Sequence, residues 1–319
     1  MVKRSPEDPR LAPIVLRREL LAQGHCDRTI GRLVADGVLH RLRYGSYVER
    51  SKWAACDKVG QHGLVVRAAI KRSVADVVVS HISALPEWDV PLWDLPLDVV
   101  HLTRTDQRAG RREAGVLQHL GQLREEDVVD LHGLKVTSPT RTALDCMTVM
   151  DVEHSLVVVN DLLHRKLTTA AELKKGQEFM RTWPGSLQQG LVLQLADARC
   201  GASVGEGRTV HLIFKHGLPK AEPQVPIPDE TGRIVAYVDF AWPELGVFLE
   251  FDGRVKYQEL LKPGESATDV VLREKEREKL ICRLTGWRCI RITWADLAQP
   301  ERTAEMIRRA LFGNRFGVR

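Results

Sequence analysis

The chain has 319 residues, of which 44% are hydrophobic, and its 47 basic and 42 acidic side chains give a net charge of +5. This length and composition predict a globular protein of two or three domains and exclude a disordered or fibrous chain. No apolar run approaches the roughly 20 residues of a membrane helix, and the opening MVKRSPEDPR lacks the apolar core of a signal peptide. We therefore expect a cytoplasmic protein without membrane association.

Cysteine and histidine spacing suggests no metal-binding motif. The 6 cysteines are scattered without a CxxC pair, which argues against a zinc knuckle and a disulfide framework. The 11 histidines show no HExxH spacing, and singly they are interpreted as core or surface residues.

The first fifty residues have the pattern of a winged helix-turn-helix domain. Apolar residues recur at helical spacing over 11–22, and a second helix is predicted over 28–36 with Asp27 as its N-cap. The run VLHRLRYGSYV then predicts two short strands that turn near Tyr44. We assign residues 1–50 to this domain.

Five residues of this domain are candidates for contact with double-stranded DNA. Arg28, Thr29 and Arg32 share one face of the second helix, which could enter a major groove. Arg41 and Arg43 alternate along the wing toward the phosphates. The same fifty residues hold ten basic and six acidic side chains, an asymmetry that favours a polyanionic partner. The alternative is that these arginines only solvate the surface.

The middle of the chain, residues 51–200, is predicted to mix helices and short strands. Ser138 and Pro139 predict the start of a helix that contains Arg141 and Asp145. These two residues and His81 are interpreted as a structural hydrogen-bond network rather than a catalytic group. The chain has no glycine-rich phosphate loop and no Gly-x-Ser-x-Gly elbow.

The last part, residues 201–319, begins with a capping pattern and a proline-rich segment. Ser203 and Glu206 have the spacing of a capping box, so Glu206 is predicted to cap its own helix. The segment AEPQVPIPDETG is interpreted as a link into the next element. Further on, a charged helix over 268–284, a strand over 287–294 and a last helix over 301–312 are predicted.

The run RIVAYVDFAWPELGVFLEFD predicts a β-hairpin that turns at residues 243–246. With this turn, the expected pairs are Trp242 with Val247, Phe240 with Leu249, and Val238 with Phe251, so that one face is apolar.

The other face of this hairpin is acidic. Asp239 is expected opposite Glu250, with Asp252 two residues further along. Three carboxylates in register repel one another, and Mg²⁺ or Mn²⁺, which prefer oxygen ligands, would relieve the repulsion. The alternative is an acidic face that simply meets water.

The last third of the chain resembles the very-short-patch-repair-like (Vsr-like) branch of the PD-(D/E)XK nucleases, a restriction-endonuclease-like α/β fold. The resemblance rests on Asp239, on EFDG at 250–253, and on a charged helix followed by Gly286-Trp287 and the strand CIRITW. It implies that Asp239 and Glu250 hold a metal and that Glu206 is a supporting acid. Asp252 stands where these nucleases commonly carry a lysine, and Lys256 and Lys275 are the candidate replacements. The resemblance also makes Lys275 and Arg277 candidates for contact with the scissile phosphate.

The front of the chain resembles the abortive-infection AbiEi-type antitoxins. The resemblance rests on RTIGRLVADGVLHRLRYGSYV and continues through VVSHISALPEWDVP, DVVHLTR and GLKVTSPTRTALDC. It implies a winged helix that binds the promoter of its own operon and a cognate toxin encoded nearby. The predicted fold class is therefore α/β, or α+β overall: a winged helix, a mixed α/β middle domain and a nuclease-like C-terminal domain.

Two functions follow from these patterns. The first is a DNA-binding, metal-dependent endonuclease linked to phage defence or a toxin-antitoxin system, with Asp239, Glu250, Asp252 and Lys256 as its catalytic residues. The second is a non-catalytic type IV antitoxin and transcriptional autorepressor that keeps the nuclease-like fold as a scaffold.

Overall fold

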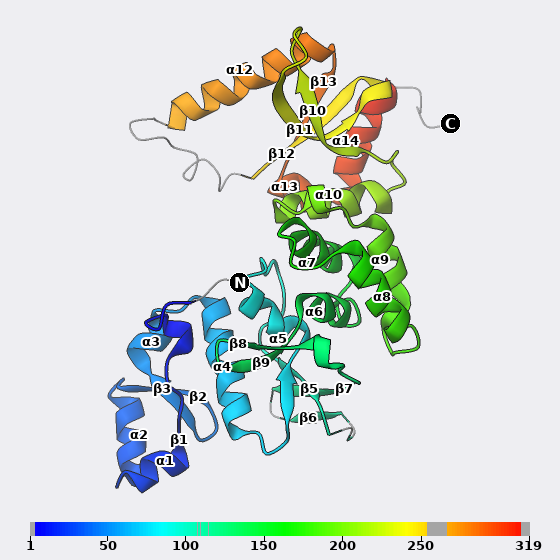
Figure 1. The fold of residues 1–319 in the computed structure, drawn as a ribbon. Coiled ribbons are helices and arrows are strands. Elements are labelled where there is room, and N and C mark those ends of the chain that lie inside the picture. The colour runs from blue at the N-terminus through cyan, green and yellow to red at the C-terminus, as the bar shows by residue number, and fades with distance from the viewer. Residues whose placement is uncertain (1–3, 107, 109, 114, 254–266, 314–319) are drawn as a thin grey trace. The chain divides into compact units, whose positions relative to one another are not determined.

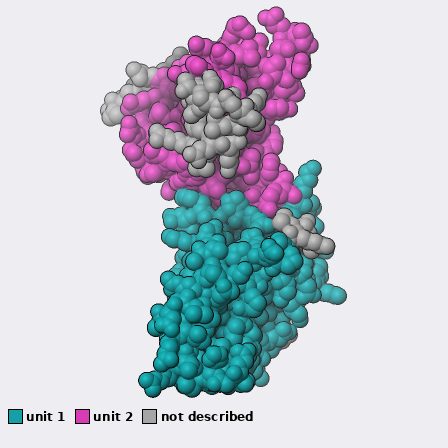
Figure 2. Space-filling view, turned by 90° about the vertical axis from the view of Figure 1, so that its left-hand side faces the viewer, with its two compact units in different colours: residues 1–151, 166–193 teal, residues 152–165, 194–319 magenta. Residues whose placement is uncertain are grey.

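The computed structural model describes residues 4–106, 108, 110–113, 115–253 and 267–313. They form an α+β protein with three sheets (Figure 1). The chain divides into two compact units, one made of residues 1–151 and 166–193 and the other of residues 152–165 and 194–319 (Figure 2). Within the described ranges, no helix has the length and apolar character needed to cross a membrane.

The first unit begins with the winged helix. Its elements are η1 (Pro9–Leu11), β1 (Val15–Leu16), α1 (Arg17–Ala22), α2 (Asp27–Ala35), β2 (Leu39–Arg43) and β3 (Ser46–Glu49). The strands form a small sheet in the order β1-β3-β2. The first helix is shorter than predicted, because Val15 and Leu16 pair with Tyr47 and Ser46 of β3 and leave only Arg17 onward to coil.

The rest of the first unit surrounds a six-stranded mixed sheet in the order β6-β7-β5-β4-β9-β8. Its elements are α3 (Arg50–Ala54), α4 (Lys58–Arg72), β4 (Val77–Val79), α5 (His81–Ala84), η2 (Leu85–Trp88), β5 (Val100–Arg104), β6 (Arg111–Glu113), β7 (Val116–Leu120), η3 (Glu125–Asp127), β8 (Val128–Leu131), β9 (Leu134–Thr137), α6 (Pro139–Cys146), α8 (Ala170–Met180), η4 (Ser186–Gln188) and most of α9 (Gln189–Leu195). Ser138 caps α6 by accepting a hydrogen bond from the backbone of Arg141, as predicted.

The second unit contains α7 (Val152–His164), η5 (Ala198–Cys200), α10 (Val204–Lys215), β10 (Glu222–Pro228), β11 (Ile234–Trp242), η6 (Pro243–Leu245), β12 (Val247–Asp252), α12 (Ala267–Thr285), β13 (Arg288–Thr293), α13 (Trp294–Leu297) and α14 (Pro300–Phe312). Its strands form a mixed sheet in the order β10-β11-β12-β13, in which β12 and β13 are parallel. One face packs against α10 and α14, and the other against α12 (Figure 1).

The division into units differs from the expected one. The winged helix and most of the middle of the chain form one unit, whereas α7, from the middle, belongs to the C-terminal unit. Helix α7 packs against α10, where Gly207 lies close to Val157, so its apolar face is buried by the later part of the chain.

The proline-rich segment is a strand rather than a link. Residues 222–228 form β10, which pairs antiparallel with β11 at the edge of the sheet. Proline lacks the backbone donor of a central strand but is tolerated at an edge. An edge position therefore lets Pro223, Pro226 and Pro228 lie in a strand.

The hairpin has the predicted turn and part of the predicted register. Trp242 pairs with Val247 and Phe240 with Leu249, and Gly246 adopts the left-handed conformation with φ of 62°. Val238 departs from the prediction, because it packs on the α12 face of the sheet while Phe240 packs on the α10 face. The alternation of faces is therefore broken at the residue between them, Asp239.

Candidate functional sites

Helix α2 presents an exposed face made of Arg28, Gly31, Arg32 and Ala35. The opposite face carries the buried Ile30, which packs with Leu20 and Tyr47 in the small core of this domain. Because residues three and four apart share a face of a helix, the two arginines flank a strip of small residues. A Cβ added at Gly31 would meet nothing within 4 Å, so a partner can approach the backbone closely here.

Thr29 does not belong to this exposed face. Its hydroxyl donates to the carbonyl of Cys26 at 2.8 Å and accepts from the Cys26 backbone N–H at 2.8 Å. The side chain therefore satisfies the first turn of α2, and Cys26 rather than Asp27 is the N-cap. Asp27 instead forms an ion pair with Arg17 at 2.6 Å.

The wing carries one exposed arginine beside an exposed aromatic ring. Tyr44 is 73% exposed, and the guanidinium groups of Arg41 and Arg72 lie 5.3 and 5.9 Å from the centre of its ring. Arg41 itself is exposed. The wing tip therefore combines positive charge with a flat apolar surface.

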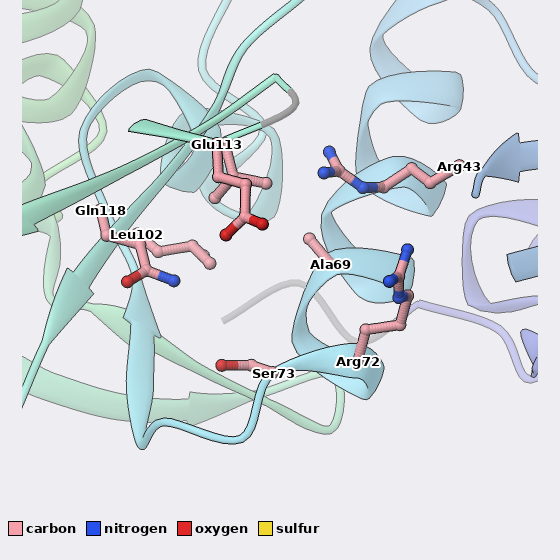
Figure 3. A pocket seen from close by; sticks show the side chains of 8 residues that line it. Arg43, Ala69, Arg72, Ser73, Leu102, Glu113 and Gln118 are labelled. Atoms are coloured by element: carbon pink, nitrogen blue, oxygen red, sulfur yellow. The ribbon is translucent and has the colours of Figure 1, made fainter. Parts of the chain in front are cut away.

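Arg43 points away from this surface. It lines a cavity of about 170 Å³ together with Arg72 and Ser73 of the α4 end and with Glu113 and Gln118 of the sheet (Figure 3). Its side chain is half-buried, and burial, with the nearby Arg72, lowers the pKa of its guanidinium. Of the predicted wing contacts, Arg41 faces outward and Arg43 faces the cavity.

The acidic hairpin residues lie at the point where β11 and β12 stop pairing. Asp239 accepts hydrogen bonds from the backbone N–H of Phe251 at 2.9 Å and from the side chain of Gln224 at 3.3 Å. Gln224 is on β10 and has a left-handed backbone with φ of 50°. The Asp239 carboxylate therefore lies where the backbone pairing of β11 with β12 has ended.

Glu250 is a partly buried carboxylate whose charge interacts with that of Asp239. Burial is the main cause that raises its pKa to about 7, and the charge of Asp239 raises it further. Arg277 of α12 opposes this effect by donating to Glu250 at 3.3 Å, and it also donates to the carbonyl of Tyr237 at 2.5 Å. Two oxygen donors that repel each other in a partly dry environment are chemically suited to Mg²⁺ or Mn²⁺.

The third acid does not complete a compact triad. Within the described residues, Asp239, Glu250 and Asp252 do not bring one oxygen each within 4.8 Å of the others. Asp252 lies instead 3.9 Å from Arg291, which is also paired with Glu278 at 2.6 Å. The convergence of three carboxylates predicted from the hairpin register is therefore wrong, because Asp239 turns toward the backbone and Asp252 toward a cation.

Three further residues were predicted to belong to this acidic site: Glu206, Lys256 and Lys275. Glu206 is buried, and its carboxylate accepts from the Ser203 hydroxyl at 3.0 Å, while Ser203 caps α10 by accepting from the backbone N–H of Glu206. Lys275 is exposed on α12. Lys256 lies outside the described residues.

A second cluster of ionisable side chains lies in the first unit, in the middle part of the chain, where no functional site was predicted. One nitrogen each of His81, His101 and His119 lies within 4.8 Å of the others. His101 Nδ1 and His119 Nε2 share a hydrogen bond at 2.9 Å, and the ring of His81 stacks on that of His119 with centroids 3.6 Å apart.

The fold explains this meeting. On the parallel strands β5 and β7, Thr103 lies opposite His119 and His101 lies opposite Leu117, so these side chains share one face of the sheet. His81 reaches the same face from the first position of α5, with a left-handed backbone of φ 51°. The cluster takes its histidines from three segments that are distant in the sequence. For this reason the spacing of histidines along the chain did not predict it.

A cavity of about 560 Å³ opens beside this cluster. Its lining includes His81, His119, Arg141, Asp145 and Trp183. Arg141 donates to Asp145 at 2.8 Å and to Asp127 at 3.1 Å, so the structural network predicted around Arg141 and Asp145 is present. His81 was predicted to belong to this network, but His101 and His119 were not predicted to lie beside it.

Comparison with known proteins adds little. No family model matches the chain, and no curated protein matches its sequence. Among solved structures, the chain is similar to the RV2827C protein from Mycobacterium tuberculosis, with 14% sequence identity and a TM-score of 0.39. The similarity covers 66% of this chain and 78% of that one.

Proposed function

We propose that this protein binds double-stranded DNA through the exposed face of α2, with the wing contacting the phosphates. The observation that carries the proposal is the face of Arg28, Gly31, Arg32 and Ala35, in which two exposed arginines flank small residues. Small side chains let a helix lie deep in a major groove, and arginine is the side chain that most often reads guanine there.

The wing supplies the second part of the proposed interface. Exposed Arg41 can reach a phosphate, and such contacts add affinity but carry no sequence information. Arg43 is no longer a candidate for direct contact, since it faces the cavity beside Arg72 and Glu113. Thr29 is likewise set aside, since its hydroxyl caps α2.

A double variant at α2 tests this proposal. Preferred duplexes would first be selected from a random pool with the wild-type chain, and binding would then be measured by fluorescence anisotropy. Each bidentate contact to a guanine is worth about 1–3 kcal/mol, or roughly 5- to 150-fold. Arg28→Ala with Arg32→Ala should therefore remove the preference for the selected duplex over a scrambled one, whereas Arg41→Ala should weaken both duplexes alike.

A charge-matched control separates specific contact from general attraction. Arg108 and Arg181 are exposed arginines of the same unit outside the winged helix. Their double alanine variant removes the same charge and should keep the sequence preference. An equal loss in the two double variants would overturn the proposed interface.

A second candidate function is metal-dependent cleavage of the bound DNA, and the electrostatic repulsion between Asp239 and Glu250 favours it. In the second unit, burial raises the pKa of Glu250 to about 7 and the charge of Asp239 adds to this shift, an arrangement that a hard cation would relieve. Asp239 and Glu250 would hold Mg²⁺ or Mn²⁺, and Arg277 would have to release Glu250. Fold does not imply activity, so the alternative is an antitoxin-like repressor that uses this unit as a scaffold and has a toxin partner.

A plasmid-cleavage assay distinguishes the metal-dependent nuclease from the antitoxin-like repressor. Supercoiled plasmid and single-stranded DNA would be incubated with the wild type and with an Asp239→Asn, Glu250→Gln variant, in Mg²⁺, Mn²⁺ or EDTA. Cleavage by the wild type alone supports the nuclease. Intact DNA in every tube, with retained binding to the selected duplex, supports the repressor.

A further inference from the structure

We infer that His81, His101 and His119 form a binding site for a divalent transition-metal ion such as Zn²⁺, with Asp145 as a fourth ligand. The site lies in the first unit and is independent of the proposed function. It differs in chemistry from the acidic pair of the second unit, because imidazole nitrogens favour Zn²⁺, Cu²⁺ and Ni²⁺ whereas carboxylates alone favour Mg²⁺.

The three imidazoles lie against one another, and the Asp145 carboxylate lies 4.0 Å from His81 Nδ1. His101 and His119 are hydrogen-bonded to each other through their ring nitrogens, and His81 Nδ1 contacts the hydroxyl of Ser80 at 2.9 Å. Burial lowers the pKa of His101 to about 4 and that of His119 to about 3. Neutral imidazole is the form that binds metals, so the cluster does not have to lose protons before an ion can bind.

Asp145 provides an independent sign of a ligand. The residue is 1% exposed, and its Oδ1 accepts from Arg141. Its Oδ2 is also buried, accepts no hydrogen bond from the described part of the chain, and lies 4.0 Å from His81 Nδ1. A buried carboxylate oxygen without a donor is costly, and a metal ion would satisfy it.

The orientation of the Asp145 carboxylate is fixed by Arg141, which is itself held by several contacts. Arg141 is 2% exposed and is fixed by Asp127, by the carbonyl of Gln122 at 2.7 Å and by the ring of Trp183, whose centre lies 4.7 Å from the guanidinium. Such outer contacts orient the carboxylates and imidazoles that bind metals. Arg141 therefore acts as a positioning residue for Asp145.

Metal binding requires one local rearrangement. Zinc binds nitrogen at about 2.0–2.1 Å in the plane of each ring, and two rings stacked face to face cannot direct their lone pairs at one ion. One ring of the stacked pair His81 and His119 must therefore turn, and the hydrogen bond between His101 and His119 must break. The 560 Å³ cavity that both stacked rings line provides the space.

Metal titration of the full chain tests the site. Chelator-treated protein would be titrated with ZnCl₂ and separately with MgCl₂ by calorimetry, and bound zinc would be counted after dialysis. The wild type should retain one Zn²⁺ per chain and no Mg²⁺ at this site, and zinc should raise its melting temperature. His81→Gln and His119→Gln should each weaken zinc binding at least tenfold.

Control variants and a direct measurement keep the test decisive. His164→Gln, at an exposed histidine of the other unit, and Cys26→Ser, at an exposed thiol, should leave the affinity unchanged. In the ¹⁵N-histidine NMR spectrum of the wild type, zinc should shift the ring signals of His81, His101 and His119 among the 11 histidines. Zinc binding that survives both glutamine variants, or that leaves those three signals in place, would overturn the inference; the NMR result decides even if a variant does not fold.

Discussion

The carboxylate of Asp239 accepts a hydrogen bond from the backbone N–H of Phe251 at 2.9 Å, where the pairing of β11 and β12 ends. A side chain thus replaces a strand partner, and the alternation of faces changes at this residue, with Val238 and Phe240 on opposite sides of the sheet. Of Asp239 and Glu250, Glu250 is the partly desolvated carboxyl with a raised pKa. We therefore expect its protonation to affect the stability of the second unit.

Glu250→Gln should change how stability depends on pH. The pKa of Glu250 is raised from 4.5 to about 7, so the folded state binds more protons than the unfolded state between these values. Stability should therefore fall as pH rises through this window, by up to about 3 kcal/mol at full ionisation. Urea unfolding in EDTA from pH 4.5 to 8.5 checks this: the Gln variant should show a flatter profile and gain on the wild type above pH 7. Parallel profiles would contradict it.

Gly205→Ala should destabilise the second unit. A Cβ at this position of α10 would lie 2.1 Å from the ring of Phe251, which is itself packed edge-on against Trp294. Overpacking of this kind costs about 1–3 kcal/mol. Thermal unfolding should show the loss, and adding Phe251→Leu should recover part of it.

A matched control for this variant is Gly63→Ala in α4, where an added Cβ meets nothing within 4 Å. Alanine is favoured over glycine inside a helix by about 0.8–1.0 kcal/mol, so this variant should be neutral or more stable. Equal destabilisation at Gly63 and Gly205 would show that the Phe251 contact is not the cause.

Gly31→Leu should separate folding from DNA binding. The position is exposed, and the space around its Cβ is empty, so leucine should fit and strengthen α2. The same side chain would prevent the close approach that the proposed groove contact requires. We expect an unchanged or raised melting temperature together with at least a tenfold loss of affinity for the selected duplex, and full DNA binding by this variant would contradict the docking of α2.

Arg141→Ala should be severely destabilising. It leaves the buried Asp145 without its cation and removes one of the two that pair with Asp127. Removing one partner of a buried ion pair costs about 3–5 kcal/mol. Chemical denaturation of the full chain measures this, with Arg17→Ala as the control, because its pair with Asp27 is exposed to solvent and should contribute much less to stability.

Local patterns were enough to predict the elements whose causes lie within a few residues. The wing, the cap of α6 by Ser138, the capping of α10 by Ser203 and the turn at Gly246 depend on turn and capping chemistry, and the structure has all four. The α+β fold class was predicted from these local patterns together with the resemblances to the AbiEi-type antitoxins and the Vsr-like nucleases.

The functional arrangements depended on contacts between distant segments. Gln224 and Phe251 hold the Asp239 carboxylate, and the cavity that Arg43 lines lies between the wing, α4 and the six-stranded sheet. His81, His101 and His119 meet only because α5, β5 and β7 share one face of that sheet. Strand register and helix packing bring these side chains together, and neither is encoded in the spacing of the residues along the chain.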